Sequence, residues 1–189
     1  MAENLSFAVI GGSGLYSMPG LTETTEYNLE TPFGKPSSPI VVGTLEGQRV
    51  AFLARHGQGH FITPSEVNYR ANIDVLKRCG VTDLVSLSAV GSLREEYAPG
   101  HFVCVDQMID RSEGRARSFF GSGMVAHLAL ADPVCPRLAE LLALMHIGDH
   151  HVHARLHDAD GTSREHRPLI VETGHEHVDA SPHLPHHIL

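Results

Sequence analysis

A glycine-rich turn near the start of the chain is the first segment whose residue types could do chemistry. Residues 10–14 read Ile-Gly-Gly-Ser-Gly and follow a short apolar run. Glycines after a strand let several backbone N–H groups point at one anion, and the Ser13 hydroxyl adds a donor. No Gly-Lys-Ser/Thr follows, so the segment is not a nucleotide-binding P-loop, and Ser17 stands where a dinucleotide fingerprint needs its third glycine. The turn indicates anion binding, with an ordinary tight turn as the alternative.

A second group of chemically capable side chains lies in residues 54–60, which read Ala-Arg-His-Gly-Gln-Gly-His. Arg55 presents a permanently charged fork that suits phosphate or carboxylate. His56 and His60 can each donate a hydrogen bond or exchange a proton near neutral pH. Their spacing would also suit metal ligands on a helix, but the glycines between them disfavour a helix. The segment indicates an anion-binding loop, with an incidental surface loop as the alternative.

Small and charged residues follow two further predicted strands. Ser88 and Ala89 lie among the small residues that close a predicted strand, at the carboxyl end where α/β proteins bind ligands. The charged residues 94–96 (Arg-Glu-Glu) are better interpreted as a solvated turn than as a catalytic acid pair. Asp106 also follows a strand, but a structural carboxylate that pairs with Arg111 or caps a turn is favoured over a ligand. No Ser-His-Asp order and no activated cysteine is indicated.

Alternating strand and helix patterns must position these side chains, and they predict an α/β fold. Short apolar runs that end in glycine or small residues indicate strands, and two of them around Glu46-Gly47-Gln48 predict a hairpin. The alternation favours a largely parallel or mixed sheet with ligand sites at the carboxyl ends of its strands. The predicted strands cover residues 7–10, 40–45, 49–54, 83–91 and 102–105, and the predicted helices cover residues 64–79 and 136–145.

The predicted helix over residues 64–79 has the clearest boundary signals. Apolar residues recur at helical spacing along it. Thr63 is predicted as its N-cap and Pro64 suits the first helical position, while Gly80 follows its end.

Composition excludes several classes of protein. The 189 residues are 42% hydrophobic and 19% charged, which predicts one globular domain, at most with a tail. Fourteen basic against 22 acidic residues give a net charge of −8, so the chain is expected to bind neither nucleic acid nor an anionic membrane surface. No apolar run approaches the ~18 residues of a membrane span, and no basic signal region stands at the start. Three well-separated cysteines, Cys79, Cys104 and Cys135, argue against a disulfide scaffold and favour the cytoplasm.

Seven segments that carry these features also occur together, in order, in a known family. They are residues 10–15 (IGGSGL), 31–37 (TPFGKPS), 53–57 (LARHG), 64–73 (PSEVNYRANI), 89–96 (AVGSLREE), 106–111 (DQMIDR) and 131–136 (ADPVCP). The chain resembles the trimeric purine nucleoside phosphorylases, most closely their methylthioadenosine phosphorylase branch. The resemblance extends over residues 7–145.

The resemblance implies a three-layer α/β/α nucleoside phosphorylase fold with a mixed central sheet, here truncated. It implies an enzyme in which phosphate attacks C1′ of a purine nucleoside, converting S-methyl-5'-thioadenosine to adenine and 5-methylthioribose 1-phosphate. It also implies a cytoplasmic homotrimer in purine salvage that needs no metal or organic cofactor. His60 matches a position near the sugar. The positions that match the family's phosphate ligands are Ser13, Arg55, His56, Ser88 and Ala89, the last through its backbone N–H.

The resemblance stops abruptly near residue 145. Residues 1–145 are interpreted as the N-terminal part of a phosphorylase domain and residues 146–189 as a tail outside the family pattern, holding eleven of the 15 histidines. The family's purine-binding acid is expected in a C-terminal half that does not appear, so no catalytic residue is assigned. General-acid assistance alone contributes about 10²–10⁴-fold, so we expect weak or no turnover.

A shifted reading frame near residue 146 is the favoured explanation of the tail. The alternatives are a diverged metal-binding tail, since histidine-rich tracts bind Zn, Ni or Cu, and a polar appendage in which residues 169–171 add one strand.

Other functions stay open. The substrate could be inosine, guanosine or methylthioinosine, because the discriminating side chain lies in the missing half. A rival of another class is a non-catalytic protein that binds phosphate through Ser13, Arg55 and His56. A third is a histidine-rich metal-binding protein.

Overall fold

The computed structural model describes residues 5–12, 18–121, 123–128 and 130–144, together with the backbone of three short strands between residues 152 and 164. The chain forms two compact units. The first unit comprises Met1–Ala89 and Arg111–Ala126, and the second comprises Val90–Asp110 and His127–Leu189. All of the described residues predicted to bind phosphate or sugar belong to the first unit.

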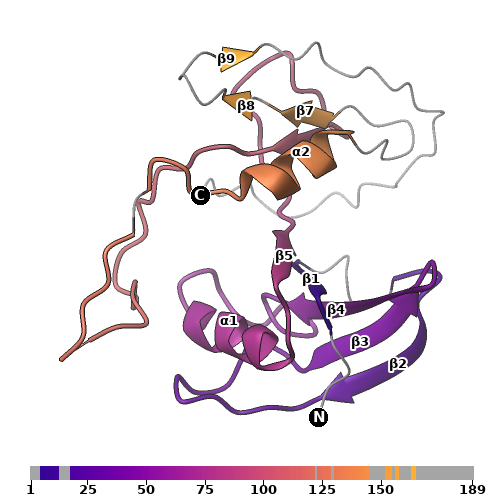
Figure 1. Cartoon of the computed structure of the whole chain (residues 1–189), viewed down its shortest axis with the longest axis vertical. Coiled ribbons are helices and arrows are strands. Elements are labelled where there is room, and N and C mark those ends of the chain that lie inside the picture. Colours follow the sequence, from indigo (N-terminus) through magenta and orange to yellow (C-terminus); the bar gives the residue numbers. More distant parts are fainter. Residues whose placement is uncertain are drawn as a thin grey trace. The chain divides into compact units, whose positions relative to one another are not determined.

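A five-stranded mixed sheet forms the first unit (Figure 1). The strands lie in the order β2-β3-β4-β1-β5, where β1 pairs in parallel with both β4 and β5 and the pairs β2–β3 and β3–β4 are antiparallel. The predicted α/β class with a mixed sheet is therefore confirmed. The strands are β1 (Phe7–Gly11), β2 (Thr22–Tyr27), β3 (Ile40–Leu45), β4 (Gln48–Ala54) and β5 (Asp83–Ser86).

The predicted hairpin is confirmed as β3 and β4. Its two-residue loop, Glu46-Gly47, has positive φ at both positions, 48° and 76°. A loop of this kind matches the right-handed twist of the flanking strands, and glycine adopts such a φ without steric cost.

Two strands differ from the prediction. The predicted strand over residues 83–91 ends at Ser86 as β5, because the chain beyond Leu87 leaves the sheet. The edge strand β2 was not predicted, since its sequence TETTEY contains no apolar run. Pairing with β3 forms this strand, and five of its six residues are exposed.

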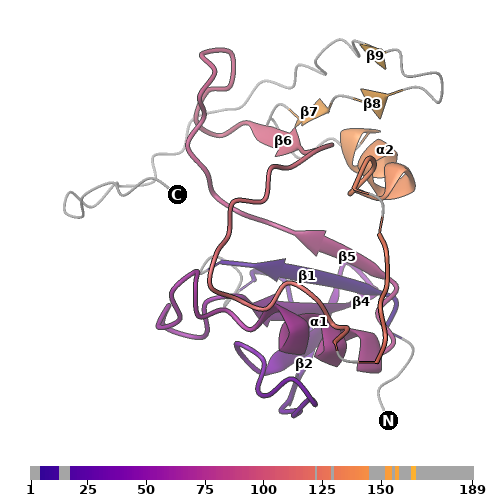
Figure 2. The same ribbon diagram turned by 90° about the vertical axis from the view of Figure 1, so that its left-hand side faces the viewer.

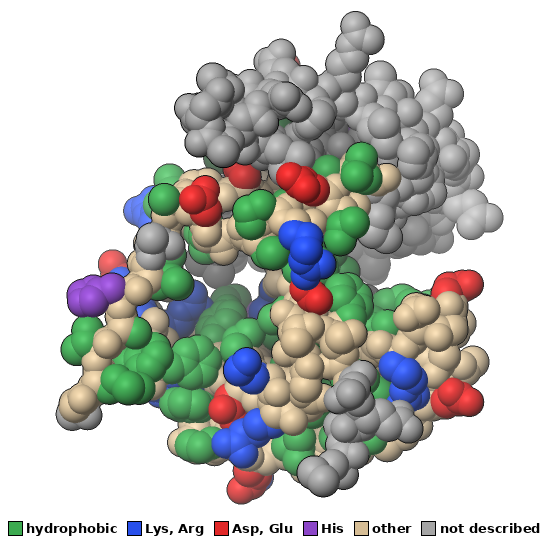
Figure 3. Space-filling view, viewed as in Figure 1, with side chains coloured by type: hydrophobic (Ala, Val, Ile, Leu, Met, Phe, Trp, Pro, Cys, Tyr) green, Lys and Arg blue, Asp and Glu red, His purple; other side chains and the backbone are tan. Residues whose placement is uncertain are grey.

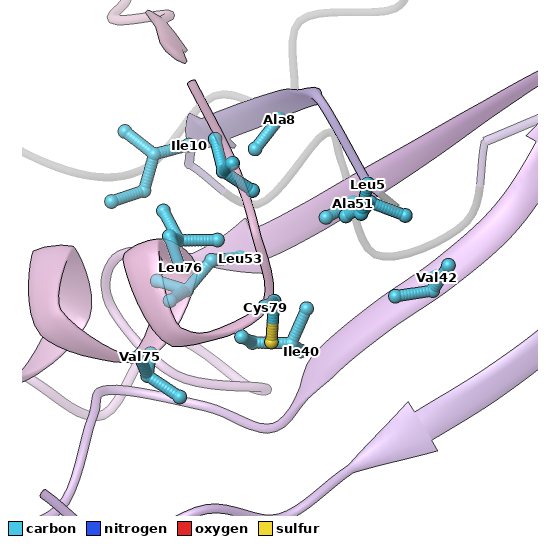
Figure 4. Close-up of a cluster of buried hydrophobic side chains, with 11 residues drawn as sticks. Leu5, Ala8, Ile10, Ile40, Val42, Ala51, Leu53, Val75, Leu76 and Cys79 are labelled. Carbon is cyan, nitrogen blue, oxygen red and sulfur yellow. The ribbon is translucent and has the colours of Figure 1, made fainter. Parts of the chain in front are cut away.

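Both faces of the sheet are packed, because successive residues of a strand point to opposite sides. Ala8 and Ile10 of β1 face the helix α1 (Tyr69–Arg78), whereas Val9 faces the other side with Phe52. Figure 2 shows α1 lying along the sheet, and Figure 4 shows the helix side chains that meet it. The buried residues on the helix side are Leu5, Ala8, Ile10, Ile40, Val42, Ala51, Leu53, Val75, Leu76, Cys79 and Val81.

The start of the predicted helix over residues 64–79 was wrong. The helix begins after Asn68, whose side-chain oxygen accepts a hydrogen bond from Ala71 N at 3.2 Å. Thr63 closes a separate turn, in which its N–H and hydroxyl both donate to the Glu66 carboxylate at 3.1 and 2.7 Å. These bonds also lower the pKa of Glu66, the Thr63 hydroxyl being the larger cause. The predicted end is confirmed, since Gly80 follows the helix and its N–H donates to Lys77 O at 3.0 Å.

The second unit contains one strand and one helix that were predicted from the sequence. These are β6 (Phe102–Cys104) and α2 (Pro136–Leu144). Strand β6 pairs in parallel with β7 (Val152–Ala154), and β8 (Leu156–His157) pairs with β9 (Ser163–Arg164). Residues 169–171, considered as a strand, lie outside the described residues. Across the part of the chain that the structure describes, no helix is both long and apolar enough to span a membrane.

Replacing Leu53 with alanine tests the central core. Leu53 lies in β4 with 0% of its surface exposed, so Leu53→Ala leaves a cavity between the sheet and α1. We expect the free energy of unfolding to fall by about 2–5 kcal/mol in urea titrations. The matched control Leu29→Ala, at a side chain 38% exposed, should cost less than about 1 kcal/mol. Equal losses would contradict this core.

Candidate functional site

The carboxyl ends of β4, β1 and β5 meet at one edge of the sheet of the first unit. The parallel pairing continues past the strands on both sides of β1. Arg55 N donates to Gly11 O at 2.8 Å, and Leu87 N donates to Ile10 O at 2.8 Å. The residues just beyond β4 and just beyond β5 are therefore both held against the end of the same central strand.

The Arg55 side chain connects these two strand ends. Its Nη1 donates to Ser88 Oγ at 2.8 Å and its Nε donates to His56 Nε2 at 3.4 Å. The structure thus brings Arg55 and His56 together with Ser88, which lies 33 residues after Arg55 in the sequence. Ala89 follows Ser88 in the same exposed segment, while Ser13 lies outside the described residues.

His56 is held by a reciprocal pair of hydrogen bonds with one residue. Its Nδ1 lies 2.8 Å from Ile62 O, and Ile62 N donates to His56 O at 3.1 Å. A carbonyl oxygen only accepts, so Nδ1 carries a hydrogen. Nε2 is then the acceptor that faces Arg55, which is the direction of the bond between them.

His60 is brought back against His56 by the turn between them. The two imidazole rings stack with their centroids 4.6 Å apart and their planes 22° apart. His60 has a left-handed backbone with φ of 61°, a conformation that costs a non-glycine residue about 1–2 kcal/mol. His60 N donates to Gly57 O at 3.2 Å, which helps to hold the turn. The residue predicted near the sugar therefore lies directly beside a predicted phosphate ligand.

This cluster has the chemistry of an anion site. A guanidinium group has five N–H donors and stays charged at any physiological pH. Ser88 accepts from Arg55, so its own hydroxyl hydrogen is available to donate to a ligand. An oxyanion at this edge would meet the positive charge of Arg55 and the hydroxyl of Ser88. The imidazole of His56 lies beside them and accepts from the Arg55 guanidinium through Nε2.

The charged turn at residues 94–96 and the considered metal ligands are the remaining candidates. Arg94 forms an ion pair with Glu96, and both side chains are at least half exposed, as a solvated turn requires. Within the residues the structure describes, no group of three His, Cys, Asp or Glu side chains is placed to hold a metal ion. The histidines of residues 146–189 lie outside the described side chains.

Two buried polar side chains beside the site were not predicted. Ser38 and Asn72 are 8% and 0% exposed. The available signal was an asparagine on the apolar face of the helix, between Ala71 and Val75, where a polar group must find a partner.

Neither Cys79 nor Cys104 is an activated nucleophile. Burial raises the pKa of the Cys79 thiol. Burial also raises the pKa of Cys104, and the nearby Asp106 carboxylate raises it further. Both therefore hold their protons more tightly than an ordinary cysteine.

Comparison with known proteins places the chain among the phosphorylases. The family model of the phosphorylase superfamily matches residues 6–164. The S-methyl-5'-thioadenosine phosphorylase of Cereibacter sphaeroides is 62% identical over 135 residues, covering 71% of this chain and 47% of that protein. The enzyme of the same name from Thermofilum pendens is 54% identical over 139 residues, covering 74% and 53%. The chain spans about half the length of the curated relatives it matches.

Solved structures agree with this placement. A methylthioadenosine phosphorylase from an antarctic soil metagenomic library aligns with a TM-score of 0.75 and 52% identity, covering 80% of this chain and 55% of that one. Methylthioadenosine phosphorylase from Schistosoma mansoni in complex with adenine aligns with a TM-score of 0.68 and 40% identity, covering 73% and 52%. These similarities confirm the expected nucleoside phosphorylase fold.

The tautomer of His56 can be measured. We expect the neutral imidazole to carry its hydrogen on Nδ1, because Ile62 O accepts from that atom. Long-range ¹H–¹⁵N NMR distinguishes the protonated ring nitrogen from the bare one, and loss of the signals in His56→Asn assigns them. A hydrogen on Nε2 would contradict the geometry.

Thiol labelling tests the cysteine environments. Cys135 is exposed, whereas Cys79 is buried with a raised pKa, so less of Cys79 is thiolate at neutral pH. We expect a neutral thiol reagent, followed by mass spectrometry, to modify Cys135 well before Cys79. The difference should disappear in denaturant, and equal rates in the native protein would refute it.

Proposed function

The chain belongs to the phosphorylase superfamily, and from this premise we propose that it serves the phosphate-dependent cleavage of a purine nucleoside. In this reaction phosphate attacks C1′ of the sugar and the purine leaves. The sugar 1-phosphate and the free base are the products. The proposed substrate is S-methyl-5'-thioadenosine, which gives adenine and 5-methylthioribose 1-phosphate.

One observation carries the proposal. Arg55 reaches across the end of β1 to Ser88 at 2.8 Å, with His56 beside it at 3.4 Å. These are the residues that the family resemblance assigns to phosphate, and they come from two separate strand ends. We place Ser13 and the backbone N–H of Ala89 in the same phosphate site.

The proposed mechanism depends on positioning and charge. Cleavage of the glycosidic bond builds positive charge on the sugar, and a phosphate dianion held against that face stabilises it. Fixing phosphate and nucleoside together also removes the entropic cost of bringing them into line. Arg55 and Ser88 would donate to the phosphate, and His56 would orient it through Arg55, whose Nε donates to the His56 ring. His60, stacked on His56, would lie toward the sugar. Among the described residues, none is proposed to donate a proton to the leaving purine.

The substrate and the cellular setting are part of the same proposal. The substrate follows the names of the relatives, with inosine, guanosine and methylthioinosine as the alternatives. The proposed setting is cytoplasmic purine salvage, without cofactor, metal, nucleic acid or membrane. We place residues 1–145 in the N-terminal part of the phosphorylase domain, and the match to the family model continues to residue 164.

We also propose assembly into a homotrimer. Hydrophobic side chains gather at the left of the face in Figure 3. In the first unit, Phe119, Phe120, Met124 and Val125 are between 44% and 78% exposed. Exposed apolar side chains that gather in one segment in this way mark candidate contacts between protein surfaces.

A second candidate is a protein that binds phosphate without catalysis. The described cluster provides donors for an anion, while its residues include no carboxylate that could bind the purine. Phosphate binding without release of base would favour this candidate.

The test uses the purified, chelator-treated chain of 189 residues. We expect it to bind inorganic phosphate in titration calorimetry, and Arg55→Ala to weaken binding by roughly 10–100-fold because a charged hydrogen-bond donor is lost. The matched control is Arg78→Ala, since Arg78 is exposed and pairs with Asp74 on α1, at 2.6 Å. It should leave the affinity unchanged.

Release of adenine from S-methyl-5'-thioadenosine, followed with and without phosphate, then separates the two candidates. Phosphate-dependent release supports phosphorolysis, and binding without release supports the second candidate. A chain that neither binds phosphate nor releases adenine would overturn both.

A further inference from the structure

Two buried polar side chains, Ser38 and Asn72, lie outside the site but next to the strand that carries it. They are 8% and 0% exposed, and they are the buried polar or charged residues among those the structure describes. A buried amide or hydroxyl destabilises the fold unless hydrogen bonds replace the water it has lost. Their hydrogen-bond partners therefore show what these two side chains hold in place.

Both polar groups of the Asn72 side-chain amide form hydrogen bonds with one residue of a distant loop. Its Oδ1 accepts from Ser37 N at 2.7 Å, and its Nδ2 donates to Ser37 Oγ at 3.0 Å. The backbone N–H of Asn72 is already used in the helix, where it donates to Asn68 O at 3.0 Å. The side chain thus adds nothing to its own helix and instead fixes the Ser37 peptide against α1.

Ser38, which follows Ser37, connects this loop to the end of β4 by a hydrogen bond. Its Oγ accepts from Ala54 N at 3.0 Å and donates to Pro39 O at 2.8 Å. The β3–β4 ladder ends with the pair Ile40–Leu53, so Ala54 N lies one residue past the last strand partner. The Ser38 hydroxyl takes the place of that partner at the residue directly before Arg55.

The turn that follows Arg55 also touches this loop. A Cβ at Gly57 would lie 3.2 Å from Ser37 O, and Gly57 has a φ of +72°. Gly57 N donates to Ala54 O at 3.1 Å, which closes the turn containing Arg55 and His56. The Ser37 backbone therefore lies against one side of this turn, between it and the helix.

We propose that Asn72 is a positioning residue for the anion site. Through Ser37 and Ser38 it sets where β4 ends, and so where Arg55 and His56 present their side chains. The role rests on the proposed function, because it concerns the same phosphate site. None of the hydrogen bonds of Asn72 reaches Arg55 or His56, so we propose that it acts through the loop.

A neighbouring asparagine provides a matched comparison. Asn68 lies one turn earlier on the same chain segment and also connects its amide to the same loop. Its Nδ2 donates to Phe33 O at 2.7 Å and to Lys35 O at 3.4 Å, and its Oδ1 caps the helix. None of these bonds reaches Ala54 or Gly57. Loss of Asn68 should weaken the fold while leaving the end of β4 in place.

The experiment compares Asn72→Ala with Asn68→Ala in the full chain, with inorganic phosphate as the probe. We expect both variants to lower the midpoint of thermal unfolding. Asn72→Ala should weaken phosphate binding about tenfold or more, the equivalent of one buried hydrogen bond, while Asn68→Ala should change it less than about twofold. Equal affinities in the two variants would overturn the proposal.

A second readout keeps the inference separate from the proposed function. Hydrogen exchange measured by NMR should show the amides of Ala54 and Gly57 less protected in Asn72→Ala than in Asn68→Ala. If the parent chain binds no phosphate, the proposed function fails, and this comparison alone decides whether Asn72 positions the turn. Unchanged protection in Asn72→Ala would then overturn the inference.

A second variant covers the case in which Asn72→Ala does not fold. Ser38→Ala removes only the hydroxyl that accepts from Ala54 N. We expect it to weaken phosphate binding and to increase exchange at Ala54, without touching Asn72. No change in either measurement would contradict the proposed path from α1 to Arg55.

Discussion

The parallel pairing of β1 with both β4 and β5 is the constraint on which the rest of the structure depends. Parallel strands end at the same edge of a sheet, so the chain after β4 and the chain after β5 must emerge side by side. Two hydrogen bonds to Gly11 O and Ile10 O extend this pairing beyond the strands. As a result, Arg55 can donate to Ser88 across 33 residues of sequence. Without this pairing, the positive charge and the hydroxyl would lie on unrelated loops.

The core and the site are stabilised by different kinds of interaction. On the helix side of the sheet, apolar residues such as Leu53 and Leu76 are almost completely removed from water. The hydrophobic effect that drives this burial is non-directional, so it sets only the packing of α1 on the strands. The end of β4 needs more than this, because an anion site works only if its donors point correctly. The directional bonds of Asn72 and Ser38 provide that orientation, and their burial strengthens them relative to bonds in water. The asparagine at the centre of an otherwise apolar helix face is thus explained by the loop it holds.

The described residues that we propose to bind phosphate lie together in a chain that spans about half the length of its relatives. Arg55, His56 and Ser88 converge within the first unit, from the residues that follow β4 and β5. Recognition of the purine is a separate task, which needs groups beyond this cluster. The proposed phosphate binding and the proposed nucleoside cleavage can therefore be tested separately in this chain.

The sequence by itself determined the elements whose signals are local. The apolar run before the glycine-rich turn predicted β1, and Glu46-Gly47 between two apolar runs predicted the β3–β4 hairpin, because a loop of this type selects its own backbone angles. The ordered motifs around Arg55, His56 and Ser88 identified the family and its candidate ligands. Tertiary structure alone decided what depends on distant partners. The polar strand β2 forms only because β3 offers it a ladder. The cap of α1 is Asn68 rather than Thr63, because Asn68 accepts from the first turn of the helix while also donating to Phe33 O. No local pattern could show that Asn72 bonds to Ser37, since hydrogen bonds between residues 35 positions apart exist only once the sheet and helix have packed together.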